Sequence, residues 1–317
     1  MQPSPLNPAQ QEVLDLLGAA PDERPEFPPE LRDELIAELE DGLAEIASEI
    51  DPDDPLFVTK RSLGAVHGCE ARHVAERSAE FEWSPPIARG SVAHKAIELS
   101  VHWRGEPNPL DMVDEALARL TEGTDGLATW LQGCTEAERA EVRALANERV
   151  VTFVECFPPL RASWRPVTEG RLRAELLGGR VVLAGRTDVS LGRASGTTAG
   201  KVVIDLKTGS FRASHLDDLR FYALVETLRL GTPPRLVASY HLDSGRAHTE
   251  LVSEGLLHAA AARTIDGAVV LHQLEVGTRA PEVRPGGGCR WCPALASCGP
   301  GRAHVGDDGP DAFDDLD

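Results

Sequence analysis

Three consecutive strand-like segments in the middle of the chain constrain its fold more than any other feature of the sequence. We expect strands over residues 164–177, 180–191 and 201–206. Gly178-Gly179 predicts a two-residue hairpin turn between the first two strands. A stretch rich in Gly, Ser and Thr over 192–200 predicts a longer loop before the third strand. The centre of the chain is therefore predicted to form a sheet.

Helices are expected on both sides of these strands in the sequence. A helix is predicted over 214–230, a strand over 236–242 and a long helix over 254–275, whereas residues 58–157 are predicted to be mostly helical. This order of elements predicts an α/β fold, in which helices flank a mixed central sheet.

The composition divides the chain into three parts. Residues 1–57 predict an acidic, helical N-terminal lobe with a stripe of leucines spaced four residues apart. We expect residues 58–302 to form the main domain, with a helical insertion at about 105–157. Residues 303–317 predict an acidic, disordered tail.

The net charge of −19 argues against a nucleic-acid-binding protein until its distribution is considered. Residues 1–60 carry 16 acidic and 3 basic side chains, and residues 301–317 carry 6 acidic and 1 basic. Residues 61–300 are therefore nearly neutral. Many of their arginines and lysines fall between positions 161 and 220, so the main domain can still present a basic cleft to nucleic acid.

The N-terminal sequence MQPSPLNPAQQ has neither a basic start nor an apolar stretch. It therefore predicts no signal peptide, and we expect a cytoplasmic protein. The apolar runs of the chain are too short to span a membrane.

Two aspartates and a lysine in the predicted strands carry the main chemical signal. Aspartate is depleted in strands, yet Asp188 lies inside one predicted strand and Asp205 lies near the end of the next. In adjacent strands the two carboxylates can converge, and a Mg²⁺ or Mn²⁺ ion would relieve their repulsion. Lys207 projects from the same face as Asp205. The set predicts metal-assisted phosphodiester hydrolysis, although a surface aspartate and a weak Asp–Lys salt bridge would give the same spacing.

These strands resemble the PD-(D/E)XK nuclease superfamily, in particular its RecB-like branch. Members carry a strand with the pattern G-x-x-D, whose aspartate is Asp188 in this chain. The next strand has the pattern (D/E)-x-K-T-G, which Asp205 and Lys207 match. A helix with a Q-x-x-x-Y pattern follows, in which Tyr222 matches but Asp218 stands in place of glutamine. The resemblance implies a restriction-endonuclease-like core with Asp188, Asp205, Lys207 and Tyr222 as catalytic residues. Tyr222 is equally compatible with core packing.

RecB-like nucleases also have a G-x-x-x-H pattern on an upstream helix, which Gly90 to His94 match. The resemblance implies that His94 binds metal together with Asp188 and Asp205. An imidazole ligand suits Mn²⁺ somewhat better than Mg²⁺. Glu169 is a weaker ligand candidate, and an ordinary helical histidine is the alternative for His94.

Three of the six cysteines form the compact motif Cys289-x-x-Cys292-x5-Cys298. A zinc ion favours four ligands, so this motif needs a fourth from elsewhere. Cys69 is the first candidate and Cys156 the second. A disulfide framework is not expected in a cytoplasmic chain of this size.

The cysteines resemble those of iron–sulfur RecB-like nucleases, such as AddB nuclease domains and CRISPR-associated exonucleases. In these families one cysteine precedes the nuclease motifs and three follow them. The resemblance implies a C-terminal iron–sulfur segment, in which Cys69, Cys289, Cys292 and Cys298 hold a [4Fe–4S] cluster and staple distant parts of the chain. Zinc is the less favoured occupant.

The motifs together predict a metal-dependent DNA nuclease, either an exonuclease or an end-processing enzyme of repair, recombination or phage defence. DNA that is single-stranded or has a free end is the expected substrate. The acidic N-terminal lobe is a candidate contact for a helicase or another protein. The departure at Asp218 keeps an alternative open, in which a weak or inactive nuclease-like module binds DNA ends or a helicase.

Overall fold

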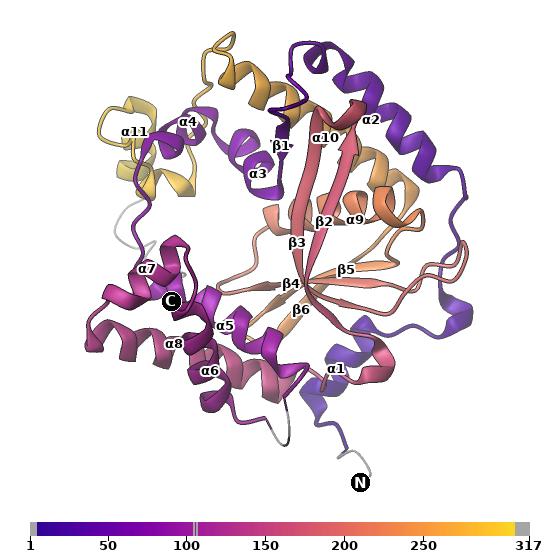
Figure 1. Ribbon diagram of the computed structural model, residues 1–317, viewed down its shortest axis with the longest axis vertical. Coiled ribbons are helices and arrows are strands. Elements are labelled where there is room, and N and C mark those ends of the chain that lie inside the picture. Colours follow the sequence, from indigo (N-terminus) through magenta and orange to yellow (C-terminus); the bar gives the residue numbers. More distant parts are fainter. Residues whose placement is uncertain (1–4, 104, 106, 308–317) are drawn as a thin grey trace.

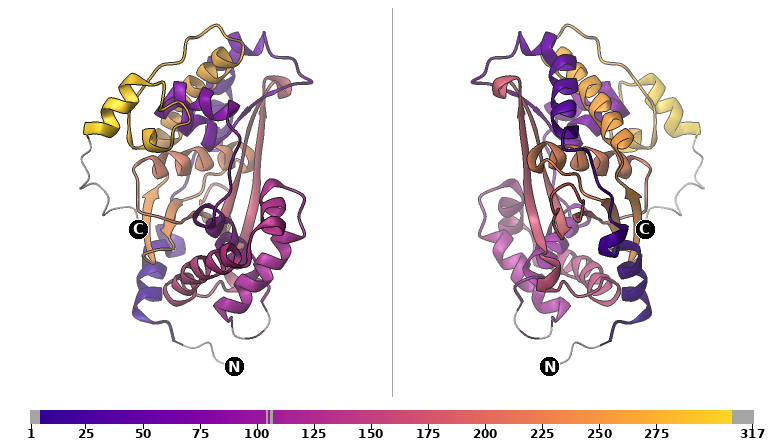
Figure 2. Two further views of the ribbon diagram at one scale, coloured as in Figure 1. Left: turned by 90° about the vertical axis from the view of Figure 1, so that its left-hand side faces the viewer. Right: turned by 90° about the vertical axis from the view of Figure 1, so that its right-hand side faces the viewer.

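The computed structural model describes residues 5–103, 105 and 107–307. Within these residues the chain forms a six-stranded mixed sheet with helices on both faces (Figures 1 and 2). The predicted α/β fold with a mixed central sheet flanked by helices is therefore confirmed. Among the described residues, no helix is both long and apolar enough to cross a membrane.

The sheet is built around one long strand, β3, which has β2 along one edge and both β1 and β4 along the other. The order is β1-β3-β4-β5-β6, with β2 paired to β3 outside this path. The β1–β3 and β4–β5 pairs are parallel and the other pairs are antiparallel. The strands are β1 (Leu56–Val58), β2 (Val167–Leu176), β3 (Val181–Leu191), β4 (Val202–Lys207), β5 (Leu236–His241) and β6 (Arg246–Leu251).

The helices form two layers, one on each face of the sheet (Figure 2). The α-helices are α1 (Pro8–Leu17), α2 (Leu31–Ala47), α3 (Lys60–Gly68), α4 (Glu70–Ser78), α5 (Pro85–Ser100), α6 (Pro109–Thr121), α7 (Gly126–Gly133), α8 (Glu136–Cys156), α9 (Ser214–Leu230), α10 (Glu254–Glu275) and α11 (Gly299–Asp307). Short 3-10 helices cover Pro21–Glu23, Ala162–Trp164, Leu177–Gly179 and Gly287–Trp291.

Strand β4 shows how the sequence supports both layers. Its side chains alternate between the two faces of the sheet. Val203 lies in the core formed with α2, α3, α9 and α10. Val202 and Ile204 lie in the core formed with α1 and α5 to α8. Asp205 and Lys207 come at the same alternation as Val203, so the charged end of β4 lies on the α3 and α9 side.

The acidic helix α2 is part of the main body of the protein. Its leucine stripe is fully buried against α10 and the sheet, because four-residue spacing places these side chains on one face. The adjoining strand β1 pairs with β3, so the boundary expected at residue 57 falls inside a strand. The buried leucines are Leu31, Leu35, Leu39 and Leu43.

Three further details differ from the sequence analysis. Residues 177–179 form a 3-10 turn in which Leu177 has a φ of 52°, in place of the two-residue hairpin turn. The edge strand β6 was not predicted, because its sequence RAHTEL carries few apolar residues. Helix α11 continues to Asp307, inside the segment expected as a disordered tail, and residues 308–317 lie outside the described residues. The expected helical insertion at about 105–157 corresponds to α6, α7 and α8.

Candidate active site

Asp188 lies at the point where three strands diverge. Its neighbour Val189 pairs with Thr168 of β2 on one side and with Ile204 of β4 on the other. One residue further in each register, Asp188 lies between Glu169 of β2 and Asp205 of β4, although the strands pair at neither position. The sheet therefore gathers three carboxylate side chains from three neighbouring strands.

Glu169 has a distorted backbone at this point. Its φ is 52°, in the left-handed region that non-glycine residues seldom adopt, and the β2–β3 register lacks the pair between Glu169 and Asp188. Strained backbone of this kind concentrates at functional sites. Here it accompanies a glutamate whose carboxylate approaches Asp188 and His94.

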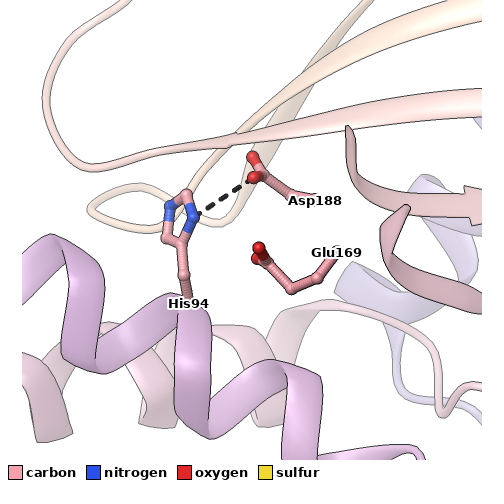
Figure 3. Close-up of side chains that lie close together, drawn as sticks. All are labelled: His94, Glu169 and Asp188. Carbon is pink, nitrogen blue, oxygen red and sulfur yellow. Dashed lines mark ion pairs between the residues drawn. The ribbon is translucent and has the colours of Figure 1, made fainter. Parts of the chain in front are cut away.

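His94, Glu169 and Asp188 form a cluster of metal-ligand type (Figure 3). One ligand atom from each lies within 4.8 Å of the other two. His94 projects from α5, and its Nδ1 lies 3.3 Å from Asp188 Oδ1. The backbone N–H of Leu206 donates to the other Asp188 oxygen at 2.7 Å, which fixes the orientation of this carboxylate. One imidazole and two carboxylates are a donor set that suits Mn²⁺ or Mg²⁺.

The electrostatics of this cluster also favour a cation. Burial lowers the pKa of His94, but Asp188, Asp205 and Glu169 outweigh that effect, so the pKa is raised overall. Burial raises the pKa of Glu169, the Arg186 guanidinium at 2.7 Å from its Oε2 opposes the rise, and the nearby Asp188 charge adds to it, so the pKa is raised overall. A divalent ion would relieve the repulsion between the two carboxylates.

This arrangement predicts that apparent Mn²⁺ affinity increases with pH through the neutral range. A metal ion must displace the proton of His94, and the raised pKa keeps that proton bound to a higher pH. Calorimetric titration with Mn²⁺ between pH 5.5 and 8 measures this dependence. His94→Gln should lose most of it, whereas an equally steep dependence in His94→Gln would contradict the assignment.

Asp205, also expected as a metal ligand, is not in this cluster. Its side chain is 1% exposed, and each carboxylate oxygen lies 2.7 Å from a lysine Nζ, Oδ1 from Lys60 and Oδ2 from Lys207. Burial raises the pKa of Asp205, but the two ammonium groups overcome this and hold it well below its usual range. Asp205 is therefore ionised, and the ammonium groups of Lys60 and Lys207 balance its charge.

Lys60 is the residue of this site that the sequence analysis missed. It is the first residue of α3, which Thr59 caps. Its Nζ lies 4.7 Å from the centre of the Tyr222 ring as well as against Asp205. The Thr59-x-x-Ser62 capping pattern signals the start of a helix. No spacing in the sequence connects that helix with Asp205, which is 145 residues away.

Asp218, which stands where the RecB-like pattern has glutamine, contacts the predicted catalytic lysine. Its Oδ2 lies 3.1 Å from Lys207 Nζ. Burial raises the pKa of Asp218, and the charge of Lys207 opposes the rise. Lys207 is thus held between two carboxylates, on β4 and on α9.

Tyr222 packs into the core beside the site and is 2% exposed. Its ring lies against Gly185, where a Cβ atom would come within 2.7 Å of the ring. Any side chain at Gly185, the glycine of the G-x-x-D pattern, would therefore clash with the Tyr222 ring. Gly90 of the G-x-x-x-H pattern similarly faces Thr208, which would lie 3.3 Å from an added Cβ.

The structure brings Cys69 next to the C-terminal cysteine segment. Its Sγ accepts a hydrogen bond at 3.5 Å from the backbone N–H of Arg284, 215 residues further along the chain. The segment that precedes α11 lies beside α4, which begins directly after Cys69 (Figure 1). Backbone N–H groups likewise donate to Cys289 Sγ and Cys298 Sγ, each at 3.3 Å.

The other cysteines lie elsewhere. Cys156, the second candidate for the fourth ligand, is packed against Gly245 in the β5–β6 turn. Cys134 donates from its Sγ to the carbonyl of Leu131 at 3.3 Å. A tetrahedral zinc site with Zn–S bonds of about 2.3 Å would hold four sulfurs about 3.8 Å apart. Among the residues described, the four expected cluster ligands do not form such a compact group.

Among curated proteins, no sequence matches the chain. A solved structure of a candidate exonuclease from Eubacterium rectale is 13% identical, with a TM-score of 0.48, over 78% of this chain and 87% of that one. The solved structure of SSO0001 is 14% identical, with a TM-score of 0.35, over 83% and 94%. The sequence model of the PD-(D/E)XK nuclease superfamily matches residues 59–299, which contain every strand from β2 to β6. The chain therefore belongs to the PD-(D/E)XK nuclease superfamily.

Proposed function

We propose that this nuclease hydrolyses DNA with a divalent metal ion and belongs to the RecB-like branch. The observation that carries the proposal is the His94, Glu169 and Asp188 cluster beside the Asp205–Lys207 pair. An exonuclease or an end-processing enzyme is the form of activity we favour.

The residues of the site have distinct roles in this proposal. His94, Glu169 and Asp188 would hold Mg²⁺ or Mn²⁺, with Asp205 as a further ligand if Lys60 moves away from it. A bound ion of this kind polarises a phosphoryl oxygen and lowers the pKa of water. Lys207, kept in place by carboxylates on two elements, orients the attacking water and stabilises the negative charge that develops on the phosphate.

DNA that is single-stranded or has a free end is the substrate we propose. The chain lacks a Gly-x-x-x-x-Gly-Lys loop for ATP, so a helicase partner would have to supply any unwinding. The exposed acidic face of α2 is the proposed contact for such a partner. Repair, recombination and phage defence are the processes in which this activity would serve.

End-labelled single- and double-stranded DNA tests the proposal. The protein should shorten at least one of these substrates when Mn²⁺ or Mg²⁺ is present, and EDTA should stop the reaction. The alternative is an inactive module that binds DNA ends or a helicase. It predicts binding of the labelled ends without cleavage in either metal, and that result would overturn the nuclease proposal.

We further propose that Cys69, Cys289, Cys292 and Cys298 bind a [4Fe–4S] cluster. Two observations support this. Cys69 lies beside the C-terminal segment, and three of the four sulfurs accept backbone N–H hydrogen bonds, which stabilise thiolate ligands. Residues 276–298, between α10 and α11, include no buried residue and little regular structure. The buried Glu70 carboxylate of α4 anchors the first part of this segment through Arg279 and the Glu282 N–H, but the cysteines lie beyond these contacts. The cluster would join α4 to the C-terminal end of the chain.

Purification without oxygen tests this proposal. We expect brown protein that contains about four iron atoms per chain, and Cys298→Ser should lose both the colour and the iron. Cys134→Ser is the matched control, since Cys134 lies outside the cysteine segment, and it should stay brown. Colourless wild-type protein that contains stoichiometric zinc would refute the cluster.

A further inference from the structure

A cavity of about 340 Å³ lies at the opposite end of β4 from Lys207. Its apolar lining includes Leu17 at the end of α1, Trp164, Leu191 at the end of β3 and Val202 at the start of β4. Val202 and Asp205 are about 10 Å apart along the strand, at about 3.3 Å per residue. The cavity is therefore separate from the cluster described above, and its volume falls within the usual range for small-molecule sites.

Four arginines line this cavity, and no aspartate or glutamate lines it. They come from four separate segments and are Arg24, Arg165, Arg193 and Arg235. Within the described part of the chain, none of the four forms a salt bridge. Such a concentration of unpaired positive charge is unexpected in a protein with a net charge of −19. We call this site the arginine cavity.

Of the four arginines, Arg235 gives the strongest evidence that this cavity binds an anion. It is 6% exposed, and its guanidinium donates one hydrogen bond, to the backbone carbonyl of Leu17. Its Nε is buried without a partner, and so is the Nε of Arg24. Burial and the nearby charge of Arg24 lower the pKa of Arg235, so the two guanidinium groups repel each other. A buried guanidinium without a carboxylate is strongly unfavourable unless an anion completes the site.

We propose that the arginine cavity binds the phosphate of a nucleotide. Guanidinium groups bind phosphate through paired N–H donors, and Arg235 and Arg24 each have an unused buried donor for it. Trp164 and Leu17 offer an apolar surface to the sugar and base, since bases stack on aromatic side chains. Arg165 and Arg193, which are exposed, extend the positive charge to the mouth of the cavity. This inference does not depend on the proposed nuclease activity.

Two sources share this chemistry, a free nucleoside monophosphate and the 5′-phosphate end of a DNA strand. Calorimetry in EDTA separates binding here from metal-dependent binding at the cluster. We expect dAMP to bind, and deoxyadenosine, which lacks the phosphate, to bind at least about tenfold more weakly. A 5′-phosphorylated oligonucleotide that binds more tightly than its 5′-hydroxyl counterpart, and that dAMP displaces, would identify the strand end as the source. Binding of dAMP without that difference would identify the free nucleotide.

Two variants test the residues. Arg235→Met removes the buried guanidinium, and the double variant R165A/R193A removes two exposed ones without disturbing the core. Each should weaken dAMP binding by at least about tenfold. Arg119→Ala, which removes an exposed arginine on the remote helix α6, is the matched control and should leave binding unchanged. The proposal is overturned if neither dAMP nor the phosphorylated oligonucleotide binds, or if the folded double variant binds both as tightly as the wild type.

Discussion

Asp188→Asn is expected to reduce the rate of phosphodiester hydrolysis by at least about a thousandfold while the protein stays folded. The substitution removes one negative charge from the cluster that His94 and Glu169 complete. It also removes the acceptor that holds His94 Nδ1 at 3.3 Å. The amide oxygen of asparagine can still accept the hydrogen bond from Leu206 N, so the β3–β4 contact survives.

Two measurements on purified protein check this expectation. Cleavage of end-labelled DNA in Mn²⁺ gives the rate, and urea unfolding gives the stability. Asp114→Asn is the matched control, because it breaks an exposed ion pair between Asp114 of the remote helix α6 and Arg143 of α8. It should cleave at the wild-type rate. Cleavage by folded Asp188→Asn within a few-fold of the wild type would show that the cluster is not the catalytic site.

Asp205→Ala should also abolish cleavage, but we expect it to lower the free energy of unfolding by about 3–5 kcal/mol as well. The substitution leaves Lys60 and Lys207 close together and removes the carboxylate that both of them contact at 2.7 Å. Asp218 still pairs with Lys207, whereas Lys60 loses its only described salt-bridge partner. Loss of activity in Asp205→Ala can therefore come from the missing carboxylate or from the lower stability of the fold. Asp188→Asn should stay folded, so its loss of activity reports on the mechanism alone.

The double variant D205A/K60M tests the reason for this instability. Removing Lys60 along with its partner should restore part of the lost stability, whereas Lys60→Met alone should cost less than Asp205→Ala because Lys207 still pairs with Asp205. Urea unfolding of the four proteins gives the coupling energy between the two residues. If Asp205→Ala had the same free energy of unfolding as the wild type, the ion pair between Asp205 and Lys60 would not stabilise the fold as we infer.

The contacts of Asp205 with Lys60 and Lys207 also predict how the stability of the protein depends on pH. The pKa of Asp205 is lower in the folded state than its unfolded value of about 3.9. Its stabilising contribution is therefore fully present above about pH 4 and is lost as the pH falls through the folded-state pKa. The stability difference between the wild type and Asp205→Ala should shrink as unfolding is measured at progressively lower pH below 4.

Residues that carry local signals were predicted well from the sequence. The helix expected over 214–230 coincides with α9, because its apolar periodicity and the Gly231 that ends it are local features. Asp188, Asp205 and Lys207 stood out because aspartate is depleted in strands, and His94 was added through the resemblance to RecB-like nucleases, whose patterns are short and contiguous. The structure places all four at the divergence of β2, β3 and β4 or directly beside it.

Residues whose positions depend on tertiary contacts were not predicted in the same way. Lys60 reaches Asp205 only because α3 packs against α9, and Glu169 reaches the cluster through a left-handed backbone that propensities do not foresee. The acidic character of residues 1–57 suggested a separate lobe. The leucine stripe of α2 instead packs against α10, since burying that stripe stabilises the fold whatever the charge of the opposite face.

The most direct test of the proposed function is the cleavage of end-labelled DNA by the wild-type protein as the Mn²⁺ concentration is varied. A divalent-metal nuclease predicts a rate that saturates with Mn²⁺, falls to background in EDTA and is lost in Asp188→Asn. Cleavage that persists in EDTA, or no cleavage of single- or double-stranded ends in either Mn²⁺ or Mg²⁺, would contradict it.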